Sequence, residues 1–98
     1  MITEHDEAKN TVNIRKHGLS FQTASKAFAD PSAVIEFDEA HSIHEDRYNL
    51  IGAVDGHILF IVYTVRDEAI RLISARTATN KEIERYYDAR RTTRTRAY

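Results

Sequence analysis

Glutamate, histidine and arginine side chains recur along the sequence in a combination that could cleave RNA. RNA carries its own nucleophile, the 2′-hydroxyl. Cleavage therefore needs a base for that proton, cationic donors for the pentavalent phosphate and an acid for the leaving 5′-oxygen. Glu45 is the preferred candidate base and His17 a candidate acid, with His44 as a further possibility. The candidate phosphate-binding side chains are Arg47, Arg71 and Arg76.

The spacing of two of these arginines argues against a simple grouping. Arg71 and Arg76 are five residues apart in one predicted strand, where successive side chains point to opposite faces. They can line one site only if a bulge or the strand end reorients one of them. Arg47, close to Glu45, could also be no more than one half of a surface ion pair, which contributes little to stability.

Other chemistries have weaker support. The chain has no cysteine, which excludes disulfides, thiolate metal sites and a cysteine nucleophile. His41 and His44 lie near Glu45 and Asp46 and could in principle hold zinc, but two histidines in a loop are more often merely polar. The three glycines are scattered and form no phosphate-binding loop. We therefore expect neither a metal nor a cofactor.

Charge is unevenly distributed, although the net charge is only −1. Residues 1–68 carry a balance of −6 and residues 69–98 a balance of +5, and the positive charge of the second segment comes mostly from arginine. Arginine suits phosphate because its planar fork donates two parallel hydrogen bonds. Tyr86 and Tyr87 are equally suited to packing, and Lys16 to an ordinary helix end. The further candidates for RNA contact are Lys16, Arg85, Tyr86, Arg90 and Arg91.

The first elements that must position these residues are two helices. The first spans residues 7–17, with Asp6 as its N-cap, Gly18 at its end and an imperfect stripe of Ala8, Val12 and Ile14. The second is short, starts at a Ser20 cap and must stop near Asp30, because the following proline disfavours helical geometry there.

A change to two-residue periodicity after Pro31 predicts four strands, at residues 33–37, 48–53, 57–64 and 69–76. Asp55-Gly56 is the strongest hairpin signal, and residues 66–68 make a second turn. The third strand is almost continuously apolar, as expected of a central strand buried on both faces. Thr79 and Glu82 form a capping box that starts the last helix. The fold class is therefore α+β: two N-terminal helices, a four-stranded antiparallel sheet and a C-terminal helix.

A single domain accounts for residues 1–98, with residues 89–98 as a basic tail that could be flexible. The apolar share of 42% argues against general disorder. The longest apolar run, residues 58–63, is far too short to cross a bilayer, and the acidic start lacks the apolar segment of a signal peptide. We expect a cytoplasmic protein.

The order of several short motifs resembles that of BrnT-type toxins, over about residues 5–88. Lys-His-Gly at residues 16–18 together with Ile-Ser-Ala-Arg at residues 73–76 is the most specific combination. One departure is His5, where the family usually has an aromatic residue before the first aspartate. The other matching segments are residues 6–10, 13–21, 27–31, 45–47, 71–76 and 84–87.

This resemblance implies a RelE-like ribonuclease toxin that inhibits translation. Together with the candidate residues it leads us to expect a metal-independent endoribonuclease, with single-stranded or ribosome-engaged RNA as its substrate. It also implies a BrnA-type antitoxin with a ribbon-helix-helix element, a toxin homodimer within the complex, and DNA binding only through the antitoxin. Glu45, Arg47, Arg71 and Arg76 would belong to the functional surface. The alternatives are a non-catalytic module that docks on a protein or nucleic acid and, less favoured because the basic segment contains no helix-turn-helix pair, a DNA-binding regulator.

Overall fold

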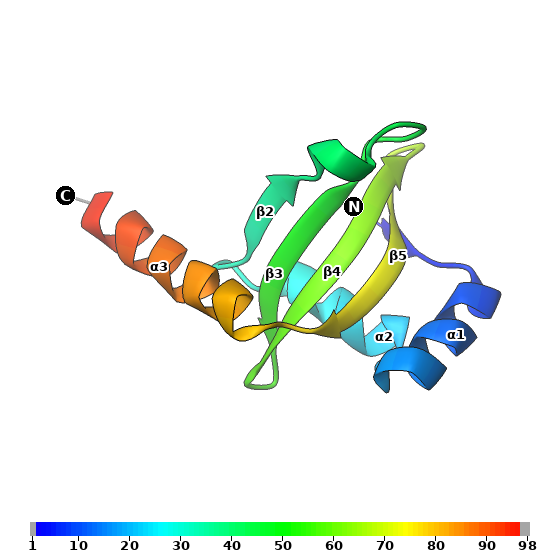
Figure 1. The fold of residues 1–98 in the computed structure, drawn as a ribbon, viewed down its shortest axis with the longest axis horizontal. Helices are drawn as coiled ribbons and strands as arrows, with labels where there is room; N and C mark the ends of the chain where they lie inside the picture. Colours follow the sequence, from blue (N-terminus) through cyan, green and yellow to red (C-terminus); the bar gives the residue numbers. More distant parts are fainter. Residues whose placement is uncertain (1, 97–98) are drawn as a thin grey trace.

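The structure, a computed structural model, describes the backbone of residues 2–96 and the side chains of residues 2–90 (Figure 1). After an additional first strand, helices and strands follow the predicted α+β order. The elements are β1 (Ile2–Glu4), α1 (Glu7–His17), α2 (Phe21–Ala24), η1 (a 3-10 helix, Ser25–Ala29), β2 (Val34–Phe37), η2 (a 3-10 turn, Glu39–His41), β3 (Tyr48–Val54), β4 (His57–Arg66), β5 (Ala69–Thr77) and α3 (Asn80–Arg96).

The strands form one five-stranded sheet in the order β1-β5-β4-β3-β2. The predicted antiparallel meander is confirmed for β2 through β5. The prediction of a purely antiparallel, four-stranded sheet is wrong, because β1 adds a fifth strand parallel to β5. β1 has three residues, all exposed, so it has neither the length nor the alternating burial that reveals a strand in a sequence.

Local signals for turns and caps are confirmed. Asp55 and Gly56 have φ of 49° and 84°, the left-handed geometry that the favoured two-residue hairpin requires. In α1, Asp6 accepts a hydrogen bond from the Ala8 N–H (2.7 Å), and Gly18 ends the helix with φ 68°. Ser20 caps α2 as predicted.

The capping box of α3 is formed in both directions. The Thr79 N–H donates to Glu82 Oε1 (2.8 Å), and the Glu82 N–H donates to Thr79 Oγ1 (3.3 Å). The helix then continues to Arg96, so most of the predicted basic tail has a helical backbone that extends away from the sheet (Figure 1). The side chains after Arg90 lie outside the described residues, as do residues 97 and 98.

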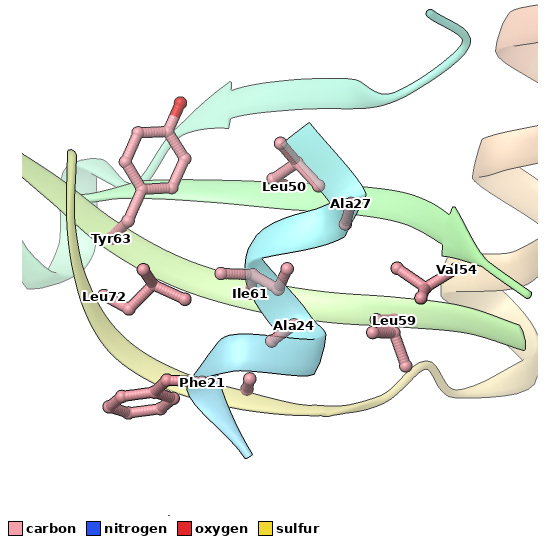
Figure 2. Close-up of a cluster of buried hydrophobic side chains, with 10 residues drawn as sticks. Phe21, Ala24, Ala27, Leu50, Val54, Leu59, Ile61, Tyr63 and Leu72 are labelled. Carbon is pink, nitrogen blue, oxygen red and sulfur yellow. The ribbon is translucent and has the colours of Figure 1, made fainter. Parts of the chain in front are cut away.

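The hydrophobic core lies between one face of the sheet and α2 with η1 (Figure 2). Phe21, Ala24 and Ala27 pack on Leu50 and Ile61, and all five side chains are at most 1% exposed. Gly52 makes this close approach possible. A Cβ there would lie 2.9 Å from Leu50 Cδ2 and 3.2 Å from the Ala27 carbonyl oxygen.

Helix α1 packs against the edge of β5 through polar contacts. Asn13 donates to the Ala75 carbonyl (2.8 Å) and accepts from the Ala75 N–H (3.0 Å), so its amide replaces a neighbouring strand. Asn10 accepts from the Phe21 N–H (2.8 Å). The predicted apolar stripe of α1 is wrong: the buried residues are these asparagines, whereas Val12 and Ile14 are 58% and 44% exposed.

His5 packs in the manner of an aromatic side chain. Its ring meets Phe21 edge to face, with 5.5 Å between the ring centroids. The residue that departs from the BrnT-type pattern therefore contacts the start of α2, where an aromatic ring could also pack.

The second face of the sheet is only partly covered. β4 lies in the middle of the sheet, but Phe60 and Val62 on this face are half-buried, so the prediction of burial on both faces is wrong. The α3 residue Arg85 forms an ion pair with Glu36 of β2 on this same side, which leaves the region over β4 and β5 open. In the described part of the chain, no helix is long and apolar enough to cross a membrane.

Candidate functional site

A β-bulge decides which β5 side chains share the open face. Val62 pairs with Ser74 whereas Tyr63 pairs with Leu72, so Ile73 is an extra residue in β5. On one side of this bulge Arg71 pairs with Thr64, and on the other side Arg76 pairs with Phe60. Thr64 and Phe60 lie on one face of β4, and paired side chains share a face. Arg71 and Arg76 therefore both lie on the open face.

A depression of about 460 Å³ lies on this open face, and we call it the central pocket. Its floor comes from β3, β4 and β5, and its rim from the η2 turn and the residues leading into β3. It brings together two of the predicted phosphate-binding arginines with polar groups that the sequence did not single out. The lining residues are Asp38, His41, Arg47, Asn49, Phe60, Val62, Ile73, Ser74 and Arg76.

Arg76 is held in one orientation. Its two terminal nitrogens donate to the two carboxylate oxygens of Glu82 (2.8 and 2.9 Å), and its guanidinium lies 4.3 Å above the Phe60 ring centroid. The hydrogen bond to Glu82 raises the pKa of Arg76 further. Nη1 also donates to the Thr77 carbonyl, which leaves two of the five N–H groups without a bond to any described residue.

Arg47 lines the pocket from the start of β3. Glu45 lies 3.8 Å from its Nη2 and 3.2 Å from Nη2 of Arg66, so the predicted base is engaged by two cations and does not line the pocket. Arg47 Nε and Asn49 Oδ1 are buried and have no hydrogen-bond partner among the described residues. An unpaired buried polar atom costs about 1–3 kcal/mol, so a ligand or water that reaches these atoms would be stabilised.

An aspartate–histidine pair completes the rim. Nδ1 of His41 lies 3.0 Å from both carboxylate oxygens of Asp38. The Asp38 side chain is 15% exposed and that of His41 is 70% exposed, so the carboxylate is sheltered and the imidazole faces solvent. The prediction missed this pair, and it missed Asn49 and Phe60. The three-residue spacing of Asp38 and His41 in a turn was the available signal.

Lys16 and His17 lie at a second depression, about 390 Å³ in volume, between α1 and β5. We call it the α1 groove. His17 therefore does not line the central pocket. The two depressions share Ile73 and Ser74, so the bulge of β5 separates them and a long ligand could cross from one to the other. The residues lining the α1 groove are Ala8, Lys9, Val12, Asn13, Lys16, His17, Ile73 and Ser74.

Comparison with known proteins adds one decisive match. A family model described as the ribonuclease toxin BrnT of type II toxin-antitoxin systems matches residues 5–82 of this chain. The chain belongs to the BrnT family. It is therefore a ribonuclease toxin of a type II toxin-antitoxin system by family, and an antitoxin is the partner that such a system implies. No curated protein matches the chain.

The BrnT match spans Lys16, His17 and the whole central pocket, and it ends at Glu82. Of the predicted arginines within it, Arg71 does not line the pocket. Its Nη1 lies 3.5 Å from Glu4 of β1, toward the sheet edge. The remaining predicted RNA contacts on α3 lie beyond the match.

Two side chains of α3 connect the helix to the rest of this BrnT protein. Arg85 donates to Glu36 of β2. Tyr86 is 3% exposed and donates to Asp30 (2.6 Å), so its ring is not available for stacking on a base. Arg90 lies 5.8 Å from the ring centroids of both Tyr86 and Tyr87. The Arg91 side chain lies outside the described residues.

Metal ligands do not gather in the part of this BrnT protein that the structure describes. No group of three or more histidine, aspartate or glutamate side chains there could hold an ion. His41, one of the two loop histidines considered as zinc ligands, instead pairs with Asp38.

Proposed function

We propose that this BrnT protein is a metal-independent endoribonuclease that inhibits translation. The observation that carries this proposal is the convergence of Arg47 and Arg76 on the central pocket, on an open face of the sheet. Two guanidinium groups facing one cavity are suited to a phosphate whose charge increases in the transition state. The membership of the ribonuclease toxin family supplies the reaction class.

In this proposal the scissile phosphate binds between Arg47 and Arg76. Arg76 contributes its two remaining N–H groups, and Glu82 with the Phe60 ring fixes the direction of those donors. A preorganised donor stabilises the transition state because it does not have to reorient as charge develops. Glu82 also neutralises part of the charge of Arg76, so orientation matters more here than net attraction.

The RNA strand runs from the central pocket over the β5 bulge into the α1 groove. Lys16 and His17 then lie beside the flanking nucleotides, and Ser74 lies between the two depressions. Such a path favours single-stranded RNA, whose backbone can bend across the sheet. Arg71 contributes to the electrostatic attraction from the sheet edge, and the positive charge of Arg85, Arg90 and Arg91 on α3 favours contact with the ribosome or the antitoxin.

Glu45 receives a different role from the one that its sequence position suggested. Its contacts with Arg47 and Arg66 make it a positioning residue for Arg47 rather than the base. The Glu45 carboxylate accepts a hydrogen bond from Arg66 (3.2 Å) and forms a longer ion pair with Arg47 (3.8 Å), so its charge is directed at these cations and not at a substrate hydroxyl.

A BrnA-type antitoxin with a ribbon-helix-helix element holds the toxin inactive in this proposal. The toxin forms a homodimer within that complex, and DNA binding belongs to the antitoxin. The proposal places the protein in the cytoplasm, because translated RNA is found there.

The experiment is an RNA cleavage assay with the purified chain, on free RNA and in a translating extract, with and without EDTA. We expect unchanged cleavage in EDTA, and loss of cleavage for Arg47→Ala and Arg76→Ala. Arg15→Ala is the matched control, since Arg15 is an exposed residue of α1 that lines neither depression. Complete loss of wild-type cleavage in EDTA would exclude the metal-independent mechanism.

A further inference from the structure

The central pocket holds two candidate phosphate ligands but, with Glu45 bound by arginines and His17 in the α1 groove, neither predicted proton-transfer residue. A reaction that starts by removing the 2′-hydroxyl proton needs a base within hydrogen-bond reach of the same phosphate. His41 is the histidine on the rim of the central pocket, and a neutral imidazole has one nitrogen that can accept a proton.

The hydrogen bond of His41 selects one tautomer of its ring. Nδ1 lies 3.0 Å from both oxygens of the Asp38 carboxylate, which can only accept a hydrogen bond when ionised. Nδ1 therefore carries the hydrogen, and in the neutral ring Nε2 is the unprotonated nitrogen. Nε2 has no hydrogen-bond partner among the described residues, and the His41 side chain is 70% exposed. The nitrogen that can accept a proton is thus the one that a substrate can reach.

The turn that carries the pair is tied to Arg47. The Asp38 N–H donates to the Arg47 carbonyl (2.8 Å), and the Arg47 N–H donates to Ser42 Oγ (2.9 Å). The Ser42 hydroxyl in turn donates to the Asp38 carbonyl (2.5 Å). These hydrogen bonds connect the turn that carries His41 directly to the backbone of Arg47.

We propose that His41 and Asp38 form the proton-transfer pair of the central pocket, with His41 as the catalytic base and Asp38 as its positioning residue. This inference rests on the proposed ribonuclease function and names the base for that reaction. A surface histidine paired with an aspartate is often only a weak ion pair. Here the pair instead lines the same cavity as Arg47 and Arg76, and its carboxylate is sheltered.

The step balances with water as the only other reactant. His41 Nε2 takes the proton of the 2′-hydroxyl, the 2′-oxygen attacks phosphorus, and the bond from phosphorus to the 5′-oxygen breaks. The leaving 5′-oxygen takes a proton from a solvent water, and the proton on His41 neutralises the resulting hydroxide. The products are a 2′,3′-cyclic phosphate and a free 5′-hydroxyl.

The pH dependence follows from the groups around the imidazole. Asp38 faces it from its own turn, Arg47 lines the same pocket from the start of β3, and Arg76 lines it from β5, with Glu82 bound to that arginine. Only the neutral ring accepts the proton of the 2′-hydroxyl, so the cleavage rate should fall when the solution becomes acidic enough to protonate His41.

The test uses His41→Asn, with His57→Asn as the matched control. His57 is exposed at the β3–β4 hairpin, at the far end of the sheet from η2 (Figure 1). We measure cleavage from pH 5 to 8 on free RNA and in a translating extract, the 3′ ends of the products, and binding of a 2′-O-methyl oligonucleotide, which cannot be cleaved. Circular dichroism checks the fold of each variant.

We expect His41→Asn to lower the cleavage rate about 10²- to 10⁴-fold and to flatten the pH profile, with oligonucleotide binding unchanged. Asp38→Asn should lower the rate less, and the double variant should be no slower than His41→Asn alone, since both residues act through one imidazole. His41→Gln provides a second variant if His41→Asn is misfolded.

Wild-type cleavage and a wild-type pH profile in a folded His41→Asn protein would overturn the assignment of His41 and leave the ribonuclease function standing. Absence of wild-type cleavage both on free RNA and in the extract would instead overturn the proposed function, and the inference with it. Products ending in a 3′-hydroxyl would exclude attack by the 2′-oxygen.

Discussion

Arg71 and Arg76 lie on the same face of the sheet although five residues separate them, because Ile73 is an extra residue in β5. Their partners on β4, Thr64 and Phe60, are four residues apart, which corresponds to roughly 13 Å along the strand. Both arginines therefore contribute positive charge to one surface. Only Arg76 reaches the central pocket.

The first prediction follows from that separation. Arg76→Ala should lower kcat/KM for RNA cleavage about 10²- to 10³-fold, as expected for loss of one preorganised donor. Arg71→Ala should lower it less than tenfold and should weaken the dependence of RNA binding on salt. Equal losses for the two variants would contradict the placement of Arg71 outside the pocket, and Arg15→Ala controls for the loss of one positive charge.

Glu82 should matter for stability as well as for the site. It caps α3 through Thr79 and holds both terminal nitrogens of Arg76. We expect Glu82→Gln to lower the free energy of unfolding by about 1–2 kcal/mol in urea titrations and to reduce cleavage. Glu84→Gln, an exposed change on the same helix, should leave both quantities nearly unchanged.

The same carboxylate should give acid sensitivity. Burial raises the pKa of Glu82, but the hydrogen bonds from Arg76 and the Thr79 N–H outweigh burial and lower it below its ordinary value of 4.5. The folded state therefore binds fewer protons than the unfolded state. The stability contributed by Glu82 is present above about pH 4.5 and is lost as the pH falls through the lowered value. Thermal melts from pH 6 to 3 should show a shallower decline for Glu82→Gln.

Tyr86 should give the opposite dependence at high pH. Burial and the hydrogen bond to Asp30 raise the pKa of Tyr86 to about 12, from an ordinary value of 10. The folded protein retains the phenol proton more tightly, so this contribution to stability is complete below pH 10 and is lost between pH 10 and about 12. Tyr86→Phe should be less stable at pH 8 and should lose less between pH 10 and 12, as measured by urea unfolding. Identical pH profiles would contradict the Tyr86–Asp30 contact.

Asn13 should be the polar residue on which docking of α1 depends. Its amide satisfies the Ala75 N–H and carbonyl, and also the Leu19 carbonyl (2.8 Å). Asn13→Ala leaves these groups unpaired in a buried place and should cost about 2–4 kcal/mol of unfolding free energy. Asn13→Asp should be no better, because a carboxylate would face two carbonyl oxygens. Asn80→Ala, at an exposed position, is the control.

The turn between β4 and β5 offers a stabilising change. Asp67 and Glu68 have φ of 51° and 64°, a left-handed geometry that disfavours residues with a Cβ. Glu68→Gly should raise the free energy of unfolding by roughly 0.5–1 kcal/mol. Thermal melts of Glu68→Gly and Glu39→Gly separate the relief of left-handed backbone geometry from the entropic cost of a glycine. Glu39 has no positive φ, so its replacement by glycine should only destabilise the protein.

Features that depend on neighbours in the chain could be predicted from the sequence. The Asp6 and Ser20 caps, the Gly18 end and the Asp55-Gly56 turn were all correct, because each depends on a few adjacent backbone torsions and one short hydrogen bond. The apolar stripe of α1 was wrong for the complementary reason. Asn13 is buried because it pairs with Ala75, 62 residues away, and no local pattern reports such a partner.

In the central pocket, too, some residues could be identified from the sequence and others only from the tertiary structure. The sequence singled out Arg47 and Arg76 because guanidinium chemistry is visible in the residue type alone. It did not single out Asp38 or Phe60, and it considered His41 only as a possible zinc ligand, because these residues gain their role from the cavity that they share. It also suggested Tyr86 for RNA contact, a residue that the fold buries against Asp30.

The sequence by itself determined the family, the starts of the three predicted helices and the antiparallel order of β2 to β5, since these depend on residue type and local periodicity. Only the tertiary structure decided that Arg71 and Arg76 lie on the same face. A shift of one residue in strand pairing moves every later side chain to the other face, and this register depends on contacts between strands. The bulge at Ile73 makes that shift within β5. The chemistry proposed for this protein therefore depends on a pairing that no stretch of its sequence encodes alone.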